Sequence, residues 1–365
     1  MNGYTKRELC LIWLDSFIGL EYKHKQTLIN IAGQSFDAKS IVEKGKDYLL
    51  TSLSASVYST LKNSLNVEYM QSVLTNLEKS GVRVLTIYSD GYPESLKNTK
   101  IPPLVLYAKG NLELLKEKNL FAIVGSRKSL PLSLGITKDY TQSLIKAGVV
   151  PVTGIAEGVD ETVLKTSLAN GGKVISVIAG GFNSVYPKAN LKLVEEVAKN
   201  GLVLSESTLE VAPMPYMFPV RNRIFAGLSK GVLVVSAGKK SGTLWTAEYA
   251  LEYGKDVFAI PYSVGVASGE GCNNLIKQGA TLTDNPQDII SFYGFQTKQQ
   301  KMQFTQEEKS IIDVLSNGEL HINQISATLG KRAFEITPLL SVMEIKGYII
   351  KSGNVYQLTR SYSED

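Results

Sequence analysis

The chain lacks several features that would restrict its function. It has only two cysteines in 365 residues, Cys10 and Cys272, so it has no disulfide framework, and this favours a reducing cytoplasm. Its two histidines, His24 and His321, are far apart, and no spacing typical of a metal site occurs. No apolar run approaches the roughly 18 residues of a membrane span, and the amino terminus has no signal-peptide core. We therefore expect a cytoplasmic protein without a metal or a membrane partner.

Cofactor and catalytic fingerprints are missing as well. Gly125-Ser126-Arg127 follows a strand at the point where doubly wound folds place a phosphate turn, but it is not Gly-x-Gly-x-x-Gly, and no Walker sequence occurs. No cofactor is therefore expected. Glu157, Glu206 and Glu248 are candidate acids, yet nothing in the sequence pairs one of them with a nucleophile.

The bulk composition describes a mildly basic globular protein. The hydrophobic content is 44% and the net charge is +5, which is compatible with a polyanionic partner without requiring one. The length favours two or three domains.

Strand and helix patterns alternate through the middle of the chain. Runs of β-formers occur at 121–124, 149–153, 174–178, 202–204, 232–235 and 257–260. Helical patterns lie between and after them, near 134–147, 159–169, 191–199, 223–228, 244–253 and 273–277. This predicts an α/β fold with a doubly wound parallel sheet of extended Rossmann-like type over 81–293, to which strands near 82–88 and 104–107 add. Residues 1–80 are predicted to form a helical domain. Its Phe17–Leu20 segment fits either a helix-hairpin-helix turn or an ordinary helix joint.

A polar linker at 294–304 precedes a small domain at 305–365. Thr305 and Glu308 form a capping-box pattern, and helices are expected to 315, over 322–329 and over 333–345. A hairpin follows at 348–358, so the order of elements predicts a winged helix. Its charges are balanced, and binding of DNA and docking of a protein both fit.

Polar and glycine-rich loops follow the predicted strands, and they are expected at one sheet edge because parallel strands end together. Glycines there leave room for a ligand, and arginine, lysine and aromatic side chains suit a nucleic-acid strand. The candidate binding residues are Gly125, Ser126, Arg127, Gly154, Gly158, Gly180, Gly181, Phe218, Arg221, Asn222, Arg223, Lys239, Lys240, Ser241 and Gly242.

Structural roles fit several of these residues equally. Phe218 either stacks on a base or fills the core, and Arg127 either holds a phosphate or lies on the surface of a tight turn. Lys239 and Lys240 also fit a solvated loop tip. Asp160, at the start of a predicted helix, is expected mainly to cap it.

Several segments occur in one order: Gly125-Ser126-Arg127, Thr-Gly-Ile-Ala-Glu-Gly-Val-Asp at 153–160, Tyr186-Pro187, Phe-Pro-Val-Arg-Asn-Arg at 218–223 and Lys-Ser-Gly-Thr at 240–243. Over about 80–290 the chain resembles the DNA-processing protein A (DprA/Smf) family. The resemblance implies a protein that is not an enzyme, binds single-stranded DNA, usually as a homodimer, and helps to load RecA in recombination and natural transformation. It also implies that Arg127 takes a phosphate and that Phe218, Arg221 and Arg223 line or support the strand pocket.

The chain departs from the family pattern at Leu164, Ser236 and Tyr262, where a histidine, a glutamate and a glycine are usual. Two alternatives stay open. One is a nucleotide phosphoribohydrolase of the lysine-decarboxylase-like (LOG) fold, although the Pro-Gly-Gly of that motif is missing before Gly242-Thr243. The other is a nucleotide-sensing adaptor with a protein-docking winged domain.

Overall fold

The structure is a computed structural model that describes residues 3–34, 36–296, 304–316, 318–346 and 348–359. It divides into two compact units, Met1–Lys298 and Gln299–Asp365, and each is described by itself. The predicted boundary between residues 80 and 81 lies inside the first unit and stays a prediction. Most of the predicted linker lies outside the described residues.

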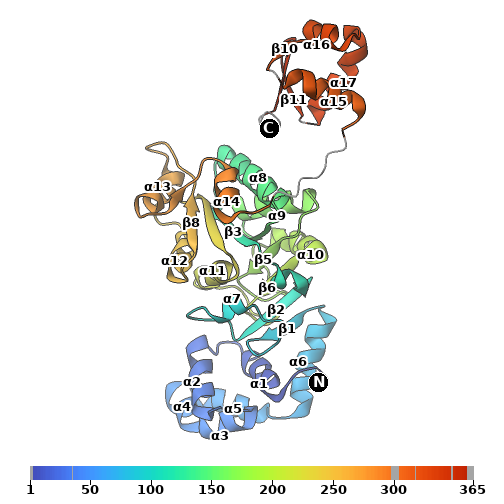
Figure 1. The fold of residues 1–365 in the computed structure, drawn as a ribbon. Helices are drawn as coiled ribbons and strands as arrows, with labels where there is room; N and C mark the ends of the chain where they lie inside the picture. The colour runs from blue at the N-terminus through green and yellow to red at the C-terminus, as the bar shows by residue number, and fades with distance from the viewer. Residues whose placement is uncertain (1–2, 35, 297–303, 317, 347, 360–365) are drawn as a thin grey trace. The chain divides into compact units, whose positions relative to one another are not determined.

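A sheet of nine strands forms the centre of the first unit, within the described residues, in the order β1-β2-β6-β5-β4-β3-β7-β8-β9 (Figure 1). In this spatial order, all neighbouring strands from β6 through β5, β4, β3, β7 and β8 to β9 pair in parallel. At the other end of the sheet, β1 pairs antiparallel with β2, and β2 pairs antiparallel with β6. The predicted doubly wound parallel sheet is thereby confirmed. The strands are β1 Arg83–Thr86, β2 Val105–Gly110, β3 Leu120–Gly125, β4 Val150–Thr153, β5 Ile175–Ile178, β6 Leu202–Ser205, β7 Gly231–Ser236, β8 Asp256–Ala259 and β9 Thr281–Leu282.

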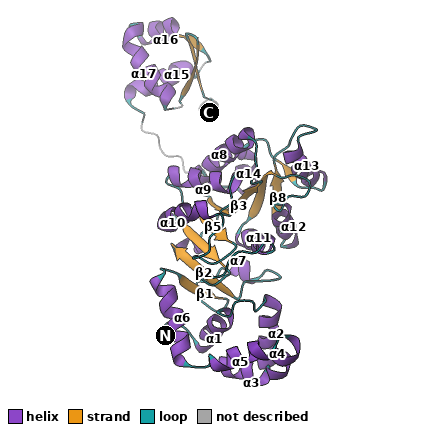
Figure 2. Ribbon diagram, turned by 180° about the vertical axis from the view of Figure 1, so that it is seen from behind, coloured by secondary structure: helices purple, strands orange, loops and turns teal. Residues whose placement is uncertain are grey.

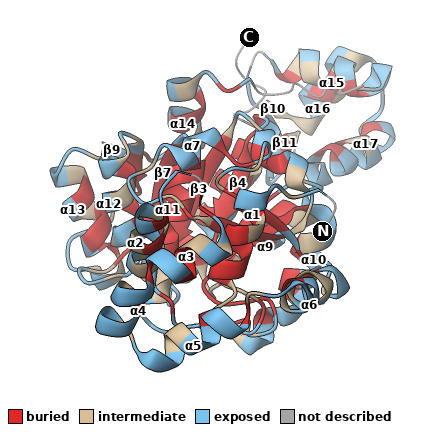
Figure 3. Ribbon diagram, turned by 90° about the horizontal axis from the view of Figure 1, so that it is seen from below, coloured by how far each residue is buried: buried red, intermediate tan, exposed pale blue. Residues whose placement is uncertain are grey.

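Strand β3 shows why the sheet is buried on both faces. Its side chains alternate, so that Phe121 and Ile123 pack with helices α8, α9 and α14, while Ala122 and Val124 pack with α11 and α12. Figure 2 shows helices on both sides of the strands, and Figure 3 shows the buried residues concentrated in the sheet.

The six predicted helices of the sheet region are present in the predicted order, whereas α7 and α14 were not predicted and α11 begins earlier than expected. The helices of this region are α7 Glu94–Lys97, α8 Pro131–Lys146, α9 Val159–Ala169, α10 Leu191–Asn200, α11 Met217–Leu228, α12 Leu244–Glu252, α13 Glu270–Lys277 and α14 Pro286–Tyr293. The sequence predicted α11 only from residue 223, whereas it begins six residues earlier. Pro219 lies in its first turn, where an amide hydrogen has no helical partner, so proline does not break the helix there.

Six helices at the amino terminus pack against the β1–β2 end of the sheet (Figure 1). Leu11, Ile12 and Leu14 of α1 are almost fully buried, and the core that they form also contains Tyr107 of β2. The Tyr107 hydroxyl donates to the Asp15 carboxylate at 2.8 Å. The helices are α1 Lys6–Asp15, α2 Tyr22–Ala32, α3 Ala38–Lys44, α4 Lys46–Ser52, α5 Ala55–Asn63 and α6 Val67–Lys79.

The second unit contains the three predicted helices and the predicted hairpin. Thr305 and Glu308 form the expected capping box, and Gly330, with φ of 63°, ends the second helix. A short strand, β10, also pairs with the hairpin and was not predicted. The elements are α15 Gln306–Leu315, β10 Leu320–His321, α16 Ile322–Leu329, α17 Ala333–Ile345, β11 Ile349–Ser352 and β12 Val355–Leu358.

In the part of the chain that the structure describes, no helix has both the length and the apolar character needed to cross a bilayer.

Candidate functional site

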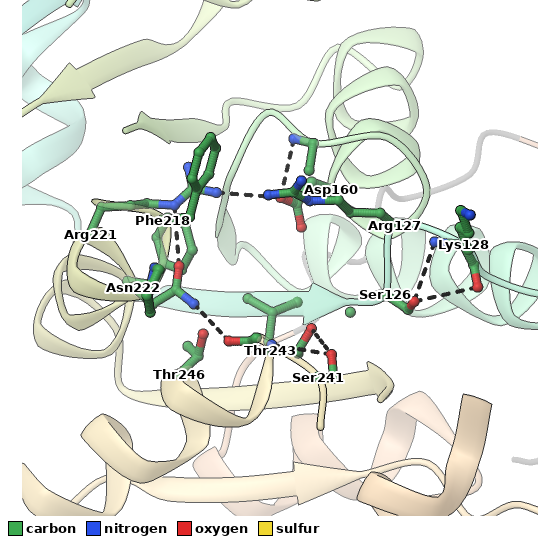
Figure 4. Close-up of a pocket in the computed structure, with 16 residues that line it drawn as sticks. Ser126, Arg127, Lys128, Asp160, Phe218, Arg221, Asn222, Ser241, Thr243 and Thr246 are labelled. Carbon is green, nitrogen blue, oxygen red and sulfur yellow. Dashed lines mark hydrogen bonds and ion pairs between the residues drawn. The ribbon is translucent and has the colours of Figure 1, made fainter. Parts of the chain in front are cut away.

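The strand order reverses between β3 and β7, which lie side by side although β4, β5 and β6 separate them in the sequence. Open α/β sheets bind ligands beyond the carboxyl ends of the strands at such a point. A cavity of about 400 Å³ lies there, and we call it the first cavity (Figure 4). Its lining residues include Gly125, Ser126, Arg127, Lys128, Ala156, Asp160, Phe218, Pro219, Arg221, Asn222, Phe225, Ser241, Gly242, Thr243 and Thr246.

The turn after β3 is tied to the neighbouring strand β7. The Ser126 amide donates to Ser236 Oγ at 3.1 Å, and Ser129 Oγ lies 2.9 Å from the same oxygen. Ser236 is fully buried. The residue that stands in place of the usual glutamate therefore anchors the turn that carries Arg127.

The departures at Leu164 and Tyr262 also have structural roles. Leu164 is fully buried in the hydrophobic core on α9. The Tyr262 hydroxyl donates to the Val235 carbonyl at 2.8 Å and lies 2.8 Å from Ser133 Oγ, so it joins α8 to β7. Neither residue lines the first cavity.

Arg127 and Phe218 face each other at the first cavity. The guanidinium carbon of Arg127 lies 4.9 Å from the centre of the Phe218 ring, and Tyr186 meets the same ring edge-on at 6.0 Å. Arg127 is exposed and has no ion pair with any described residue. Phe218 is only partly buried and belongs to none of the hydrophobic cores. Of the two roles open to Phe218, core filling is therefore excluded.

Arg221 and Asp160 form the buried back of the first cavity. Arg221 donates to the Val177 carbonyl and, at 3.2 Å, to the side-chain oxygen of Asn222, and its terminal nitrogen lies 3.9 Å from Asp160. Burial lowers the pKa of Arg221 to about 10, against the opposing charge of Asp160. Each of its three guanidinium nitrogens therefore has a protein partner, two through hydrogen bonds and one through the ion pair, so Arg221 mainly positions the wall.

The predicted capping role of Asp160 is wrong. Asp160 lies inside the first turn of α9, and Gly158 occupies the cap position without a side-chain bond. The carboxylate instead accepts from the Ala156 amide at 3.3 Å. Burial raises the pKa of Asp160, and the nearby Arg221 charge opposes that shift.

The amino-terminal end of α12 forms the opposite wall. Asn222 donates to the Gly242 carbonyl at 3.2 Å, and the hydroxyls of Ser241 and Thr243 lie 3.1 Å apart. The helix has no side-chain cap, and the buried Thr246 hydroxyl has no hydrogen-bond partner among the described residues. This end therefore presents a positive helix dipole to the cavity, although the Thr243 and Leu244 amides already donate to Ser241.

Several predicted residues do not line the first cavity. Gly154 and Gly158 lie behind it, where a Cβ on Gly158 would stand 2.5 Å from the Ser126 carbonyl oxygen. A Cβ on Gly181 would stand 1.9 Å from the Thr208 carbonyl oxygen, and one on Gly180 would be 2.7 Å from that of Val211. The prediction that Gly180 and Gly181 open a groove is therefore wrong, since neighbouring backbone fills that space.

The other predicted cationic residues lie in different parts of the structure. Lys239 and Lys240 are exposed at the tip of the loop after β7 and do not line the first cavity. Arg223 is almost fully buried on the other side of α11 and pairs with Glu206 at 2.5 Å. Burial alone would lower the pKa of Arg223, but the charge and hydrogen bond of Glu206 outweigh it and raise the pKa.

Sequence reasoning missed four residues of the site as binding candidates: Lys128, Tyr186, Thr243 and Thr246. Tyr186, Thr243 and Thr246 lie within or beside segments that carry the family resemblance, which is the signal that could have found them. Lys128 directly follows Gly125-Ser126-Arg127, so the same signal was present there.

The catalytic alternative gains no support from this arrangement. Asp160 is the only acid among the described residues that line the first cavity, and it is buried and bonded to the protein. Glu248 is exposed on α12 and does not line the cavity. Within the described ranges, no group of three or more His, Cys, Asp or Glu side chains is placed to hold a metal ion.

Comparisons of the sequence agree on one family. The model of the family described as DNA recombination-mediator protein A matches residues 83–294. The chain is 39% identical over 234 residues to the DNA processing protein DprA of Bacillus subtilis, which covers 64% of this chain and 79% of that protein. It is 41% identical over 210 residues to the DprA of Streptococcus pneumoniae, with coverages of 58% and 74%.

Two solved structures are similar at the level of the fold. The X-ray structure of DNA processing protein A from Streptococcus pneumoniae gives a TM-score of 0.67 at 32% identity, covering 79% of this chain and 98% of that chain. DNA processing protein A from Helicobacter pylori, whose structure concerns its single-stranded DNA binding mode, gives a TM-score of 0.53 at 31% identity, with coverages of 58% and 95%. From the family match over 83–294 and the identity to these relatives, the chain belongs to the DNA recombination-mediator protein A (DprA/Smf) family.

Proposed function

We propose that this protein binds single-stranded DNA at the first cavity and acts as a recombination mediator without catalytic activity. One observation carries the proposal: the exposed Arg127 guanidinium lies over the partly exposed Phe218 ring at a cavity that also holds an uncapped helix end. A guanidinium that holds phosphate beside an aromatic that stacks a base is the arrangement that single-strand binding requires.

The remaining residues of the first cavity suit the same ligand. Ser126 and the amino-terminal end of α12 near Ser241 and Gly242 line the cavity, and the helix dipole there suits a second phosphate. The Helicobacter pylori relative, described for its single-stranded DNA binding mode, supports this ligand class for the family.

The family resemblance extends the proposal to partners. A recombination mediator of this family is expected to work as a homodimer in the cytoplasm and to help RecA to assemble on the bound strand during recombination and natural transformation. The second unit, with three helices and a hairpin, then serves either DNA or a protein partner.

The direct test compares oligo-dT with duplex of the same length by fluorescence anisotropy over a series of salt concentrations. We expect tighter binding to oligo-dT, and affinity that falls steeply as salt rises. Arg127→Ala should weaken binding about tenfold. Arg7→Ala is the matched control, because Arg7 is also exposed and lies 5.8 Å from the ring of Tyr88, far from the cavity in the helical region.

Equal loss of affinity for oligo-dT in the two variants would contradict the assignment of Arg127 to the strand site.

Two further measurements test the proposed RecA partner and the enzyme alternative. RecA assembly on oligonucleotide coated with single-strand-binding protein should be faster with the wild type than with Arg127→Ala. Release of free base from nucleoside monophosphates at catalytic rates would contradict the non-enzymatic assignment.

A further inference from the structure

A second cavity of about 510 Å³ lies between the amino-terminal helices and the sheet. Tyr22 and Lys23 of α2 line one side, and Tyr216 and Met217 at the start of α11 line the other. Its formation requires both the helical region and the sheet region, which share one compact unit.

The first turn of α11 is the wall between the two cavities. Phe218 and Pro219 line the first cavity, whereas Met217 and Val220 line the second. Arg221 lines both. A chain that leaves the first cavity past Phe218 therefore reaches the second cavity by passing over the first turn of α11, and a helix with its side chains is about 10–12 Å across.

The second cavity has the chemistry of a base-binding site. Tyr22, Tyr216 and Tyr249 line it with aromatic surface, and Tyr216 is 64% exposed. Aromatic faces of this kind stack any nucleobase. Apolar side chains such as Met217 and Val220 complete the walls, as is usual where a planar ligand is held.

The charged groups of the second cavity are already paired, which argues against a phosphate in its interior. Lys25 bonds Asp15 at 2.5 Å, and Arg223 bonds Glu206 at 2.5 Å. Because these charges are paired within the protein, the interior suits a neutral heterocycle better than a phosphate.

One cation at the rim is available for the sugar-phosphate backbone. Lys23 is 70% exposed in its side chain and, among the described residues, pairs only with Glu21, which is 61% exposed, at 3.0 Å. Exposed pairs of this kind exchange readily for another anion because they contribute little free energy. The second cavity therefore offers aromatic and polar groups inside and one exchangeable cation outside.

We propose that a single strand bound at the first cavity continues across the first turn of α11 into the second cavity, where one or two bases stack on the tyrosines. This inference rests on the proposed function and extends the strand site from the sheet to the amino-terminal helices. The helical region thereby sets the length of the binding site.

The test uses the full chain and two oligo-dT lengths, about 4 and about 16 nucleotides, which span the usual site sizes for single-strand binding. Tyr216→Ala and Lys23→Ala change exposed side chains, so folding should be preserved. We expect Tyr216→Ala to weaken binding of the longer strand about tenfold. We expect Lys23→Ala to weaken it about threefold. Binding of the shorter strand should change less than twofold. Tyr88→Ala, which alters a tyrosine that is 46% exposed at another place, is the matched control.

A second readout does not depend on affinity. Photo-crosslinking of the longer strand with 5-iodouracil at single positions should label Tyr216 or Tyr22, as mapped by mass spectrometry. Equal affinities of Tyr216→Ala and wild type for both lengths, with no crosslink to either tyrosine, would overturn the inference. Failure of the proposed function is distinguishable, because the wild type would then bind neither length.

Discussion

The Arg127 guanidinium carbon lies 4.9 Å from the centre of the Phe218 ring, although the two residues belong to segments that are 91 positions apart in the sequence. The contact joins the turn after β3 to the first turn of α11 across the first cavity. It holds a cation over an aromatic face before any ligand binds, which lowers the conformational entropy lost on binding.

Substitution of Arg127 and substitution of Phe218 should change the salt dependence of DNA binding differently. Phe218→Ala should weaken single-strand binding by about 1–3 kcal/mol through lost stacking, with an unchanged slope of log affinity against log salt. Arg127→Ala should reduce that slope by about 0.7, since one phosphate contact is lost. Anisotropy titrations at several salt concentrations measure both quantities. Phe218→Tyr is the control, because it keeps the ring. A slope that falls with Phe218→Ala would contradict this division of roles.

Gly154 should tolerate no side chain. A Cβ there would stand 2.3 Å from Asp160 Oδ2 and 2.6 Å from an Arg221 nitrogen, so it would displace the buried pair. Gly154→Ala is expected to lower the free energy of unfolding by about 1–3 kcal/mol.

Gly135 offers a matched control for this substitution. It lies on α8 with nothing within 4 Å of a Cβ, and alanine is the better helix former. Gly135→Ala should therefore stabilise the protein by about 0.5–1 kcal/mol. Urea denaturation of the two variants and the wild type measures the difference, and equal stability of the two variants would contradict the close packing at Gly154.

Asp160 should make a distinctive contribution to pH dependence. Burial raises its pKa in the folded state above the usual 3.8, with Arg221 opposing the shift. The folded state therefore holds this proton more tightly than the unfolded chain. The stability contributed by protonation is fully present below pH 3.8 and is lost as the pH rises through the folded-state pKa.

The neutral variant Asp160→Asn isolates that contribution. The free energy of unfolding of the wild type minus that of Asp160→Asn should increase as the pH is lowered from 7 toward 4, because other carboxyl groups cancel in the difference. Urea titrations at each pH supply the values. A difference that decreases with acidification would show that the pKa of Asp160 is lowered.

Glu308 should show the opposite dependence in the second unit. A hydrogen bond from Lys346 at 2.7 Å, together with the Thr305 amide, lowers the pKa of Glu308 below its usual 4.5. Its stabilisation is therefore present above pH 4.5 and is lost as the pH falls through the folded-state value. Hydrogen exchange of α15 should rise more steeply with acid, after correction for intrinsic rates, in the wild type than in Glu308→Gln. If the exchange rates of the wild type and Glu308→Gln depend on pH in the same way, the Glu308–Lys346 pair does not contribute to acid destabilisation.

Much of the framework could be read from residue patterns. The runs of β-formers at 121–124 and 232–235 match strands β3 and β7, and Thr305 with Glu308 marked the start of α15. Local chemistry determines such elements, because each depends on side chains within a few residues. The two-residue strands β9 and β10 were missed, since they exist only through pairing with distant strands.

The sequence by itself determined the family, the doubly wound sheet and the gathering of Ser126, Arg127, Phe218 and Gly242 at one edge, since parallel strands end together. Only the tertiary structure decided which neighbours share a cavity. Arg221 and Arg223 are two positions apart on α11, and a helix turns by about 200° over that distance. They therefore point to different partners, Asp160 and Glu206, on opposite sides of the helix. That separation depends on what packs against each side of α11, which no local pattern contains.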